Sequence, residues 1–453
     1  MTPTETAAPP HGEQDTGTRA KAAAVVADLA DRLADPRSVA ERAAAPDNTR
    51  PLSDGTRLPV WHPVSITDGY PALALLYAEL AHTDAAYRKV AHGHLRQAAA
   101  EAAQTQTAGL YVGPFALAFA ASRAVRRPGE YASVLTRLDE RAATWVPDWL
   151  RPERERIEAG RAGTDFMTYD VVTGVTGVGR HLLDRDGEHA RSALAEILAY
   201  LVALTRPLAG AHAALPGWWV RHAPDGQMVD GYEGHGNLGL AHGIAGPLAL
   251  LALAWHAGVR VPGQDEAMAS IADWLLDWHR ADEGGAYWPP WLERQEFDTR
   301  PAELPRGRSG WCYGVPGTAR ALQLAGMALD RTDWRDFAVE ALRGTLTLTD
   351  KRHGAEDAGL CHGWAGLLHL TRLVARDSGD AELADAATRL AQRTLDLYDP
   401  EAPFGFRAAT LVHHETIDTP GFLEGAAGIA LALHAFAEDK PTASGWDAAL
   451  LVR

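Results

Sequence analysis

Two neighbouring stretches, GWCYGVPGTARAL (residues 310–322) and LCHGWAGLLHL (residues 360–370), decide the fold of this chain. Each places a polar residue before a glycine, adds a second small residue three positions later, and continues as an apolar run with helical spacing. The same pattern occurs seven times, which indicates an internal repeat. The copies are DGYPALALL from Asp68, GLYVGPFALAF from Gly109, TGVTGVGRHLL from Thr173, HGIAGPLALL from His242, YGVPGTARAL from Tyr313, HGWAGLLHL from His362 and EGAAGIALAL from Glu424.

The segments around these copies predict two kinds of helix. Runs between the copies, such as DEAMASIADWLLDWHRA (265–281), have one apolar and one charged face, which is typical of helices at a surface. Runs inside the copies, such as GPLALLALAWHAG (246–258), are apolar on every side and should be enclosed. Because the two kinds alternate, we predict an all-α fold, an α/α toroid or double-layered helical barrel of seven helix pairs. Strand-like alternation is confined to short pieces such as LPVWHP (58–63) and AYWPPWL (286–292).

The boundaries follow from composition. Residues 1–20 are rich in Pro, Thr and Gly and predict a disordered tail. Residues 21–453 should form one toroid domain. The charged stretch 122–164 leaves two interpretations open: a small inserted domain, or an ordinary outer helix with long loops.

Charge and hydropathy restrict the function. The formal net charge of -16 disfavours binding to nucleic acid, because a negative field repels phosphates. The sequence has no run of eighteen or more apolar residues and no signal-peptide pattern at the start, so we expect no membrane span and a cytoplasmic location. Two cysteines in 453 residues are too few for a disulfide scaffold and point to chemistry, ligation or burial.

The residue before the first glycine should lie at one end of the toroid, at the same height on every inner helix; six copies supply such a residue, and the second copy, from Gly109, is degenerate there. That position predicts a polar rim, which hydrophobic packing does not explain; its members are Asp68, Thr173, His242, Tyr313, His362 and Glu424.

Cys312 and Cys361 are the chain's only cysteines, and they occupy equivalent positions in adjacent copies. His362 follows the second one directly. Thiolate and imidazole are the ligands that zinc prefers, and a catalytic zinc keeps three protein ligands and one open position. A single buried cysteine is more often a small hydrophobe, but the repeat register favours a zinc site made by all three.

Several motifs resemble those of the lanthionine synthetase C-like family, specifically the class I lanthipeptide cyclases. They are WCYGVPG around Cys312, LCHGWAG around Cys361, NLGLAHGIAGP around His242 and YDVVTGVTG around Asp170. The resemblance runs from about Asp68 to Leu433. It implies an α/α toroid with one Zn2+ per chain, held by two Cys and one His. It also implies a reaction that joins a precursor-peptide cysteine to dehydroalanine or dehydrobutyrine as a (methyl)lanthionine thioether, a step of lantibiotic biosynthesis.

The resemblance also implies catalytic roles. His242 matches the active-site His and should transfer the proton to the α-carbon. Asp170 should orient His242 or tune its pKa, although a helix cap is a competing role. Tyr313 could bind the enolate oxygen or be a packed aromatic residue. Arg308 could stabilise the enolate or form a structural ion pair.

Other functions remain open on sequence alone. A family member could bind thiols or proteins without closing rings, and a zinc prenyltransferase on a related toroid also activates a peptide thiol. For a cyclase, the partners would be a dehydrated precursor peptide with its leader, a separate dehydratase and an exporter. We expect the dehydratase to be separate because the seven repeats occupy the chain.

Overall fold

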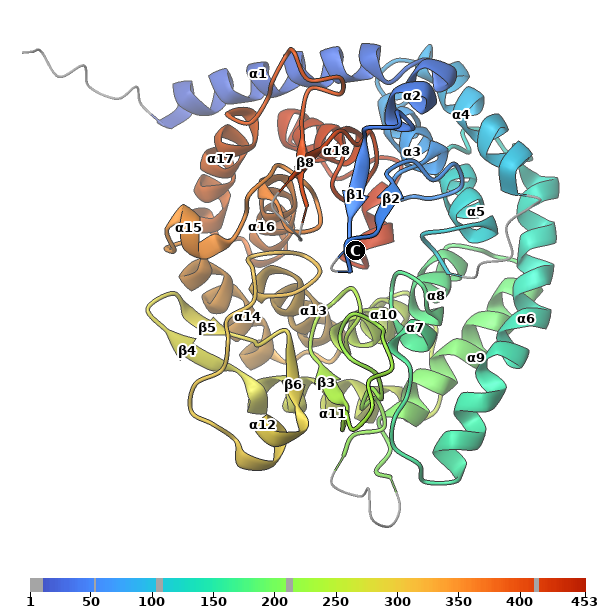
Figure 1. Cartoon of the computed structure of the whole chain (residues 1–453), viewed down its shortest axis with the longest axis vertical. Coiled ribbons are helices and arrows are strands. Elements are labelled where there is room, and N and C mark those ends of the chain that lie inside the picture. Colours follow the sequence, from blue (N-terminus) through green and yellow to red (C-terminus); the bar gives the residue numbers. More distant parts are fainter. Residues whose placement is uncertain (1–10, 53, 103–108, 209–214, 411–414) are drawn as a thin grey trace, which may run out of the picture.

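The computed structural model describes residues 11–52, 54–102, 109–208, 215–410 and 415–453. Its helices form an inner and an outer ring around a common centre (Figure 1). The predicted all-α toroid is therefore confirmed, and the glycine-rich copies supply the inner ring.

The inner ring contains seven helices within the described residues, one from each copy. Each helix contacts the next around the ring, and α18 closes the circle by packing against α3. Their side chains are almost all buried, as their uniformly apolar sequences require. The helices are α3 (Tyr70–Leu80), α5 (Pro114–Arg123), α8 (Val175–Leu183), α10 (Ala245–His256), α13 (Val315–Ala328), α16 (Trp364–Ser378) and α18 (Ala426–Glu438).

The outer ring is amphipathic and exposes its charged faces. The N-terminal helix α1 completes it by packing on α17 and α18. Its members are α1 (His11–Arg32), α4 (Tyr87–Ala102), α6 (Ala132–Glu158), α9 (Glu188–Leu204), α11 (Gln264–Trp278), α14 (Thr332–Thr345) and α17 (Ala381–Leu395). Among the described helices, none combines the length and the apolar character needed to cross a bilayer.

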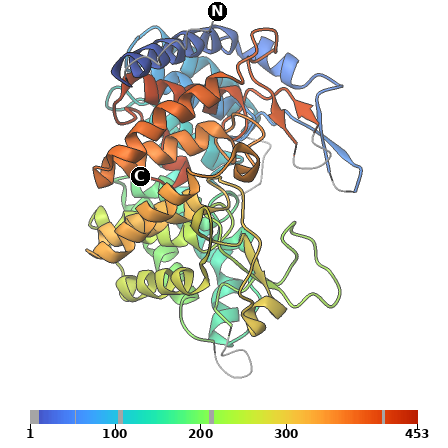
Figure 2. The ribbon, with the colours of Figure 1, turned by 90° about the vertical axis from the view of Figure 1, so that its left-hand side faces the viewer.

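Short elements project from one end of the rings, at the right of Figure 2. The strands form four antiparallel pairs within the described chain. They are β1 (Thr49–Pro51) with β2 (Arg57–Pro59), β3 (His235–Asn237) with β6 (Trp291–Glu293), β4 (Arg280–Asp282) with β5 (Gly285–Tyr287), and β7 (Ala408–Ala409) with β8 (Thr416–Ile417). The short helices are α2 (Pro36–Ala43), α7 (Phe166–Tyr169), α12 (Arg294–Thr299) and α15 (Asp350–His353). A further short element, the 3-10 helix η2 (Trp446–Leu450), does not project but is buried inside the ring.

Main-chain hydrogen bonds link the seven loops that precede the inner helices into a closed circle. Each loop bonds to the loop of the next repeat, so the height of every rim residue is fixed by its neighbours. The bonds are Ile66 N to Tyr111 O (2.8 Å), Tyr111 N to Val172 O (3.2 Å), Val171 N to Ala241 O (3.0 Å), Leu240 N to Cys312 O (2.9 Å), Trp311 N to Cys361 O (2.8 Å), Cys361 N to Leu423 O (2.8 Å) and Phe422 N to Thr67 O (2.8 Å).

The glycines of the pattern are required by tight turns in these loops. Gly314 has a φ of +107°, and a Cβ there would lie 1.8 Å from the Arg308 carbonyl oxygen. A Cβ on Gly317 would lie 2.1 Å from the Trp311 carbonyl oxygen. Any larger residue would push the loop away from its helix.

The C-terminal segment fills the inside of the ring, which the sequence did not predict (Figure 1). Residues 446–452 are buried, and side chains from separate inner helices or their loops donate to their carbonyls. These bonds join Tyr111 Oη to Ala449 O (2.9 Å), Trp311 Nε1 to Leu450 O (2.8 Å) and Arg320 Nε to Val452 O (2.9 Å).

The predicted tail of residues 1–20 is too long. Helix α1 begins at His11, and residues 1–10 lie outside the described residues. Arg19 donates to the Phe436 carbonyl, and the Thr388 hydroxyl donates to Asp15 at 2.8 Å. These partners are 417 and 373 positions away in the chain, so composition alone could not reveal them. In the stretch 122–164, the structure has the single long helix α6, which packs on α5 and α9.

Candidate metal centre

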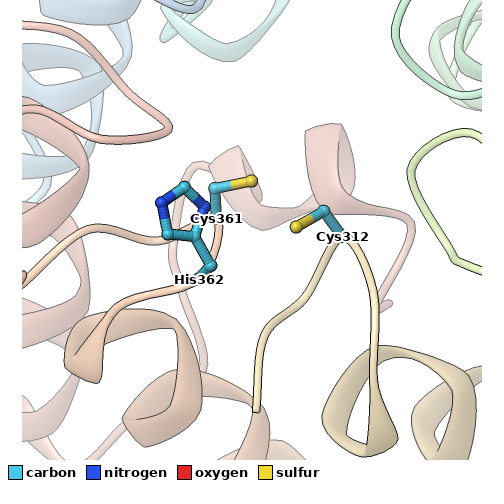
Figure 3. A group of neighbouring side chains, drawn as sticks. All are labelled: Cys312, Cys361 and His362. Atoms are coloured by element: carbon cyan, nitrogen blue, oxygen red, sulfur yellow. The ribbon is translucent and has the colours of Figure 1, made fainter. Parts of the chain in front are cut away.

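Cys312, Cys361 and His362 lie together at the rim, in the loops that enter α13 and α16. Their ligand atoms are all within 4.8 Å of one another. Figure 3 shows the two sulfur atoms pointing toward each other from neighbouring loops, with the imidazole beside Cys361. The structure thus brings together all three residues for which the sequence predicted a zinc site.

The close approach of these two loops has a local cause. The main-chain N–H groups of Trp311 and Cys312 both donate to the Cys361 carbonyl, at 2.8 and 3.3 Å. A Cβ on Gly310 would lie 2.9 Å from that same oxygen and 3.1 Å from the His362 Cβ. A glycine at position 310 therefore lets the loops meet.

The electrostatics of the cluster suit a soft divalent cation. The thiol of Cys361 and the imidazole of His362 hold the pKa of Cys312 well below its usual value, against the effect of burial. The same contact raises the pKa of Cys361. His362 is 5% exposed, and its buried Nε2 has no hydrogen-bond partner among the described residues. Such an unpartnered nitrogen beside two sulfurs fits a metal ligand.

His242 and Asp170 form a pair in the loops that enter α10 and α8. His242 Nδ1 lies 2.5 Å from Asp170 Oδ2. The Asp170 side chain is fully buried, whereas 30% of His242 is exposed. Burial lowers the pKa of His242, but the hydrogen bond and charge of Asp170, with a contribution from Cys312, raise it above its usual value.

Asp170 makes the contacts that both of the roles left open by the sequence would require. Its Oδ1 accepts from the main-chain N–H groups of Thr173 (2.7 Å) and Gly174 (2.5 Å), as a helix-capping residue does, while Oδ2 faces His242. A sequence signal for it exists: four residues before the helix-entry glycine, the last four repeats have glycine where this repeat has Asp170. Those glycines are Gly239, Gly310, Gly359 and Gly421.

Tyr313 and Arg308 lie in the same loop as Cys312. Asn237 Nδ2 donates to the Tyr313 hydroxyl at 3.2 Å, and the Tyr313 ring lies 6.3 Å from that of His242. Burial raises the pKa of Tyr313, so its proton is retained at neutral pH. Arg308 is half-buried, and within the described chain no carboxylate pairs with its guanidinium. The alternative role predicted for Arg308, a structural ion pair, is thus not found among the described residues.

A charged group that the sequence missed lies on the other side of the ligand loops. Arg50 Nη2 is 2.7 Å from Glu424 Oε2 and 3.9 Å from Asp68 Oδ1. Burial raises the pKa of Asp68 to about 6, although Arg50 opposes this shift. Glu424 and Asp68 were predicted as rim residues, but Arg50 belongs to β1, outside every repeat, and no motif marks it.

The comparisons with known proteins bear on the family and the fold of the chain. A family model described as "Lanthionine synthetase C-like protein" matches residues 60–451. The nisin biosynthesis protein NisC of Lactococcus lactis subsp. lactis is 24% identical over 402 residues, which are 86% of this chain and 89% of NisC. A solved structure of nisin cyclase superposes with a TM-score of 0.70 at 23% identity, covering 86% of this chain and 92% of that one. At that identity, the structural likeness establishes the fold.

Proposed function

The chain belongs to the lanthionine synthetase C-like family, and we propose that it is a lanthipeptide cyclase that forms thioether rings in a dehydrated precursor peptide. The thiol of a peptide cysteine adds to the β-carbon of dehydroalanine or dehydrobutyrine. The observation that carries the proposal is the cluster of two thiols and one imidazole at the rim. The names of the similar proteins, a nisin biosynthesis protein and a nisin cyclase, support it.

Cys312, Cys361 and His362 would hold one zinc ion. The donor set fits, because zinc favours thiolate and imidazole and the buried His362 Nε2 lacks any other partner among the described residues. When bound, zinc lowers the pKa of a thiol from about 8.5, so that a peptide cysteine becomes a nucleophile at neutral pH.

His242 supplies the proton that completes the addition. As the sulfur–carbon bond forms, the electron pair of the dehydro residue moves to its carbonyl oxygen as an enolate, and the α-carbon then takes up a proton. The hydrogen bond from His242 Nδ1 to Asp170 leaves Nε2 to carry that proton. The raised pKa of His242 keeps a protonated population near neutral pH, as a general acid requires.

Tyr313 and Arg308 serve the enolate in this proposal. The Tyr313 hydroxyl accepts from Asn237, and so its own proton is available for the enolate oxygen. The guanidinium of Arg308 has no carboxylate partner among the described residues, so its charge is not neutralised. Either group would stabilise negative charge that exists only during the reaction.

The chemistry also sets the place of the enzyme among its partners. Dehydro residues form by loss of water from Ser or Thr, so we infer that a dehydratase acts before this chain on the precursor peptide, which still carries its leader. Assembly with that dehydratase and with an exporter, and a location in the cytoplasm, belong to the same proposal. The prenyltransferase alternative is set aside by the family to which the chain belongs.

The direct test is incubation of the zinc-loaded chain with a dehydrated precursor peptide. Free thiols are counted by alkylation and mass spectrometry over time. We expect thiols to disappear without a change in peptide mass, because addition is an isomerisation. Binding of the peptide with no loss of thiols would instead support the family alternative, a thiol- or protein-binding protein without cyclase activity.

A further inference from the structure

A cavity of about 400 Å³ opens where α16 and α18 end, away from the metal centre. Cys361 and His362 stand at the start of α16, whereas Arg372 and Arg376 of the cavity lie in its last two turns. At 1.5 Å per residue, the two sites are roughly 15–20 Å apart along this helix. The cavity is therefore separate from the proposed reaction.

The lining of this cavity is unusually basic for so acidic a chain. Arg19, Arg372, Arg376 and Lys440 face it, from α1, α16 and the segment after α18. Two acidic residues also line it, but one of them, Asp380, is paired with Arg343 outside the cavity. Two of the cations are also paired with acids outside the lining, Arg376 with Asp377 and Lys440 with Glu438. The candidate site for an anion is therefore the space between the remaining two, Arg372 and Arg19.

Arg372 lacks the partners that a buried guanidinium normally has. Its side chain is 15% exposed, and its nearest carboxylate oxygen, on Asp439, is 3.8 Å away. No hydrogen bond from its five N–H donors is found within the described residues. Burial, together with repulsion from Arg19 and Arg376, lowers its pKa to about 10. An acceptor placed in the cavity would satisfy these donors.

Arg19 is held in place beside it. Its Nε donates to Asp15 Oδ2 at 2.8 Å, and its guanidinium lies 4.7 Å from the centre of the Phe436 ring. Asp439 approaches Arg19 at 3.5 Å as well as Arg372, yet its side chain is 69% exposed. Asp439 is thus a loosely held internal anion between the two arginines, in the place that an external anion would take.

We propose that this cavity binds a phosphate group, free or at the end of a small phosphorylated molecule, between Arg372 and Arg19. Forked guanidinium groups match the oxygen geometry of phosphate. A doubly charged ligand outcompetes a single exposed carboxylate for two cations. The cavity volume leaves room for more than the phosphate itself.

The test is calorimetric titration of the full chain, carrying its own metal, with inorganic phosphate, pyrophosphate and citrate at fixed ionic strength. We expect phosphate and pyrophosphate to bind, and Arg372→Gln to weaken binding by at least about tenfold, the effect of losing a charged hydrogen bond. The matched control is Arg389→Gln, an exposed arginine on the neighbouring α17 that does not line the cavity; it should bind as the wild type does.

A second variant keeps the proposal testable if Arg372→Gln fails to fold. Asp439→Asn removes the internal competitor, and Asn tolerates the left-handed φ of +51° at this position. We expect it to bind phosphate more tightly than the wild type. Equal binding by wild type, Arg372→Gln and Asp439→Asn would mean an adventitious ion only and would overturn the proposal. Binding of citrate without phosphate would overturn the choice of ligand.

Discussion

The loops that carry the predicted zinc ligands have a charged pair on each flank. In both pairs a nitrogen cation lies against a carboxylate. On one flank His242 pairs with Asp170, and on the other Arg50 pairs with Glu424 and Asp68. The difference is in what the cation can do. An imidazole gains and loses a proton near neutral pH, whereas a guanidinium stays protonated. Of these two cations, only His242 can therefore transfer a proton, whereas Arg50 contributes charge and stability.

The largest effect should come from removing one of the three predicted zinc ligands, which lie between the two flanks. Cys361→Ala should reduce zinc from about one ion per chain to well below that and abolish cyclisation, because two remaining ligands hold the metal poorly. Cys312→Ala and His362→Ala should behave alike. Metal analysis of the purified chains is the measurement, with Tyr313→Phe as a control in the same loop that keeps its zinc. Full zinc in Cys361→Ala would remove this residue from the ligand set.

Next in size is the loss of the proton donor itself. His242→Ala should retain its zinc and slow ring closure by about 10²–10⁴-fold, the usual contribution of a general acid. The rate of thiol loss checks this. His256→Ala, on the exposed end of the same helix α10, should close rings at the wild-type rate. If His242→Ala did so too, proton transfer would have to be assigned to another group.

A smaller effect should follow from Asp170→Asn, which keeps an acceptor for the helix cap but removes the charge. Asp170 raises the pKa of His242 in the folded protein. In the wild type, His242 therefore keeps its proton to a pH above about 6.5, the usual pKa of an imidazole. In the variant the falling limb of the rate should move to lower pH, with a loss of about tenfold per pKa unit. A pH–rate profile measures this, with the exposed Asp186→Asn as control; an unmoved limb would contradict the coupling.

The smallest effect is expected on the other flank. Arg50→Gln should leave zinc content and the rate of ring closure within about threefold of wild type, and lower the melting temperature by a few degrees. Burial raises the pKa of Asp68 to about 6, and the charge of Arg50 keeps this pKa from rising further. The loss of stability should therefore be largest above pH 6 and shrink as Asp68 becomes protonated below it. Thermal melts at several pH values test this, with the exposed Arg37→Gln as control. A large loss of rate would instead give this flank a part in the reaction.

The sequence indicated the site because the repeat places every rim residue at an equivalent position before its inner helix. Cys312 and Cys361 could be placed side by side from register alone, since adjacent copies must pack on each other to bury their apolar helices. The same reasoning placed His242 on the rim. It could not reveal Arg50, because β1 follows no repeat, nor the anchoring of α1 by Arg19, because its partner Phe436 is 417 positions away.

By itself, then, the sequence determined the toroid, the rim and the residues able to bind a metal, because hydrophobic periodicity and glycine spacing are local properties that repeat along the chain. Only the tertiary structure decided which carboxylate reaches His242, that the C-terminal segment fills the ring, and that Arg372 has no hydrogen-bond partner among the described residues of its cavity. These features depend on contacts between segments distant in the chain. No local pattern in the sequence encodes such contacts.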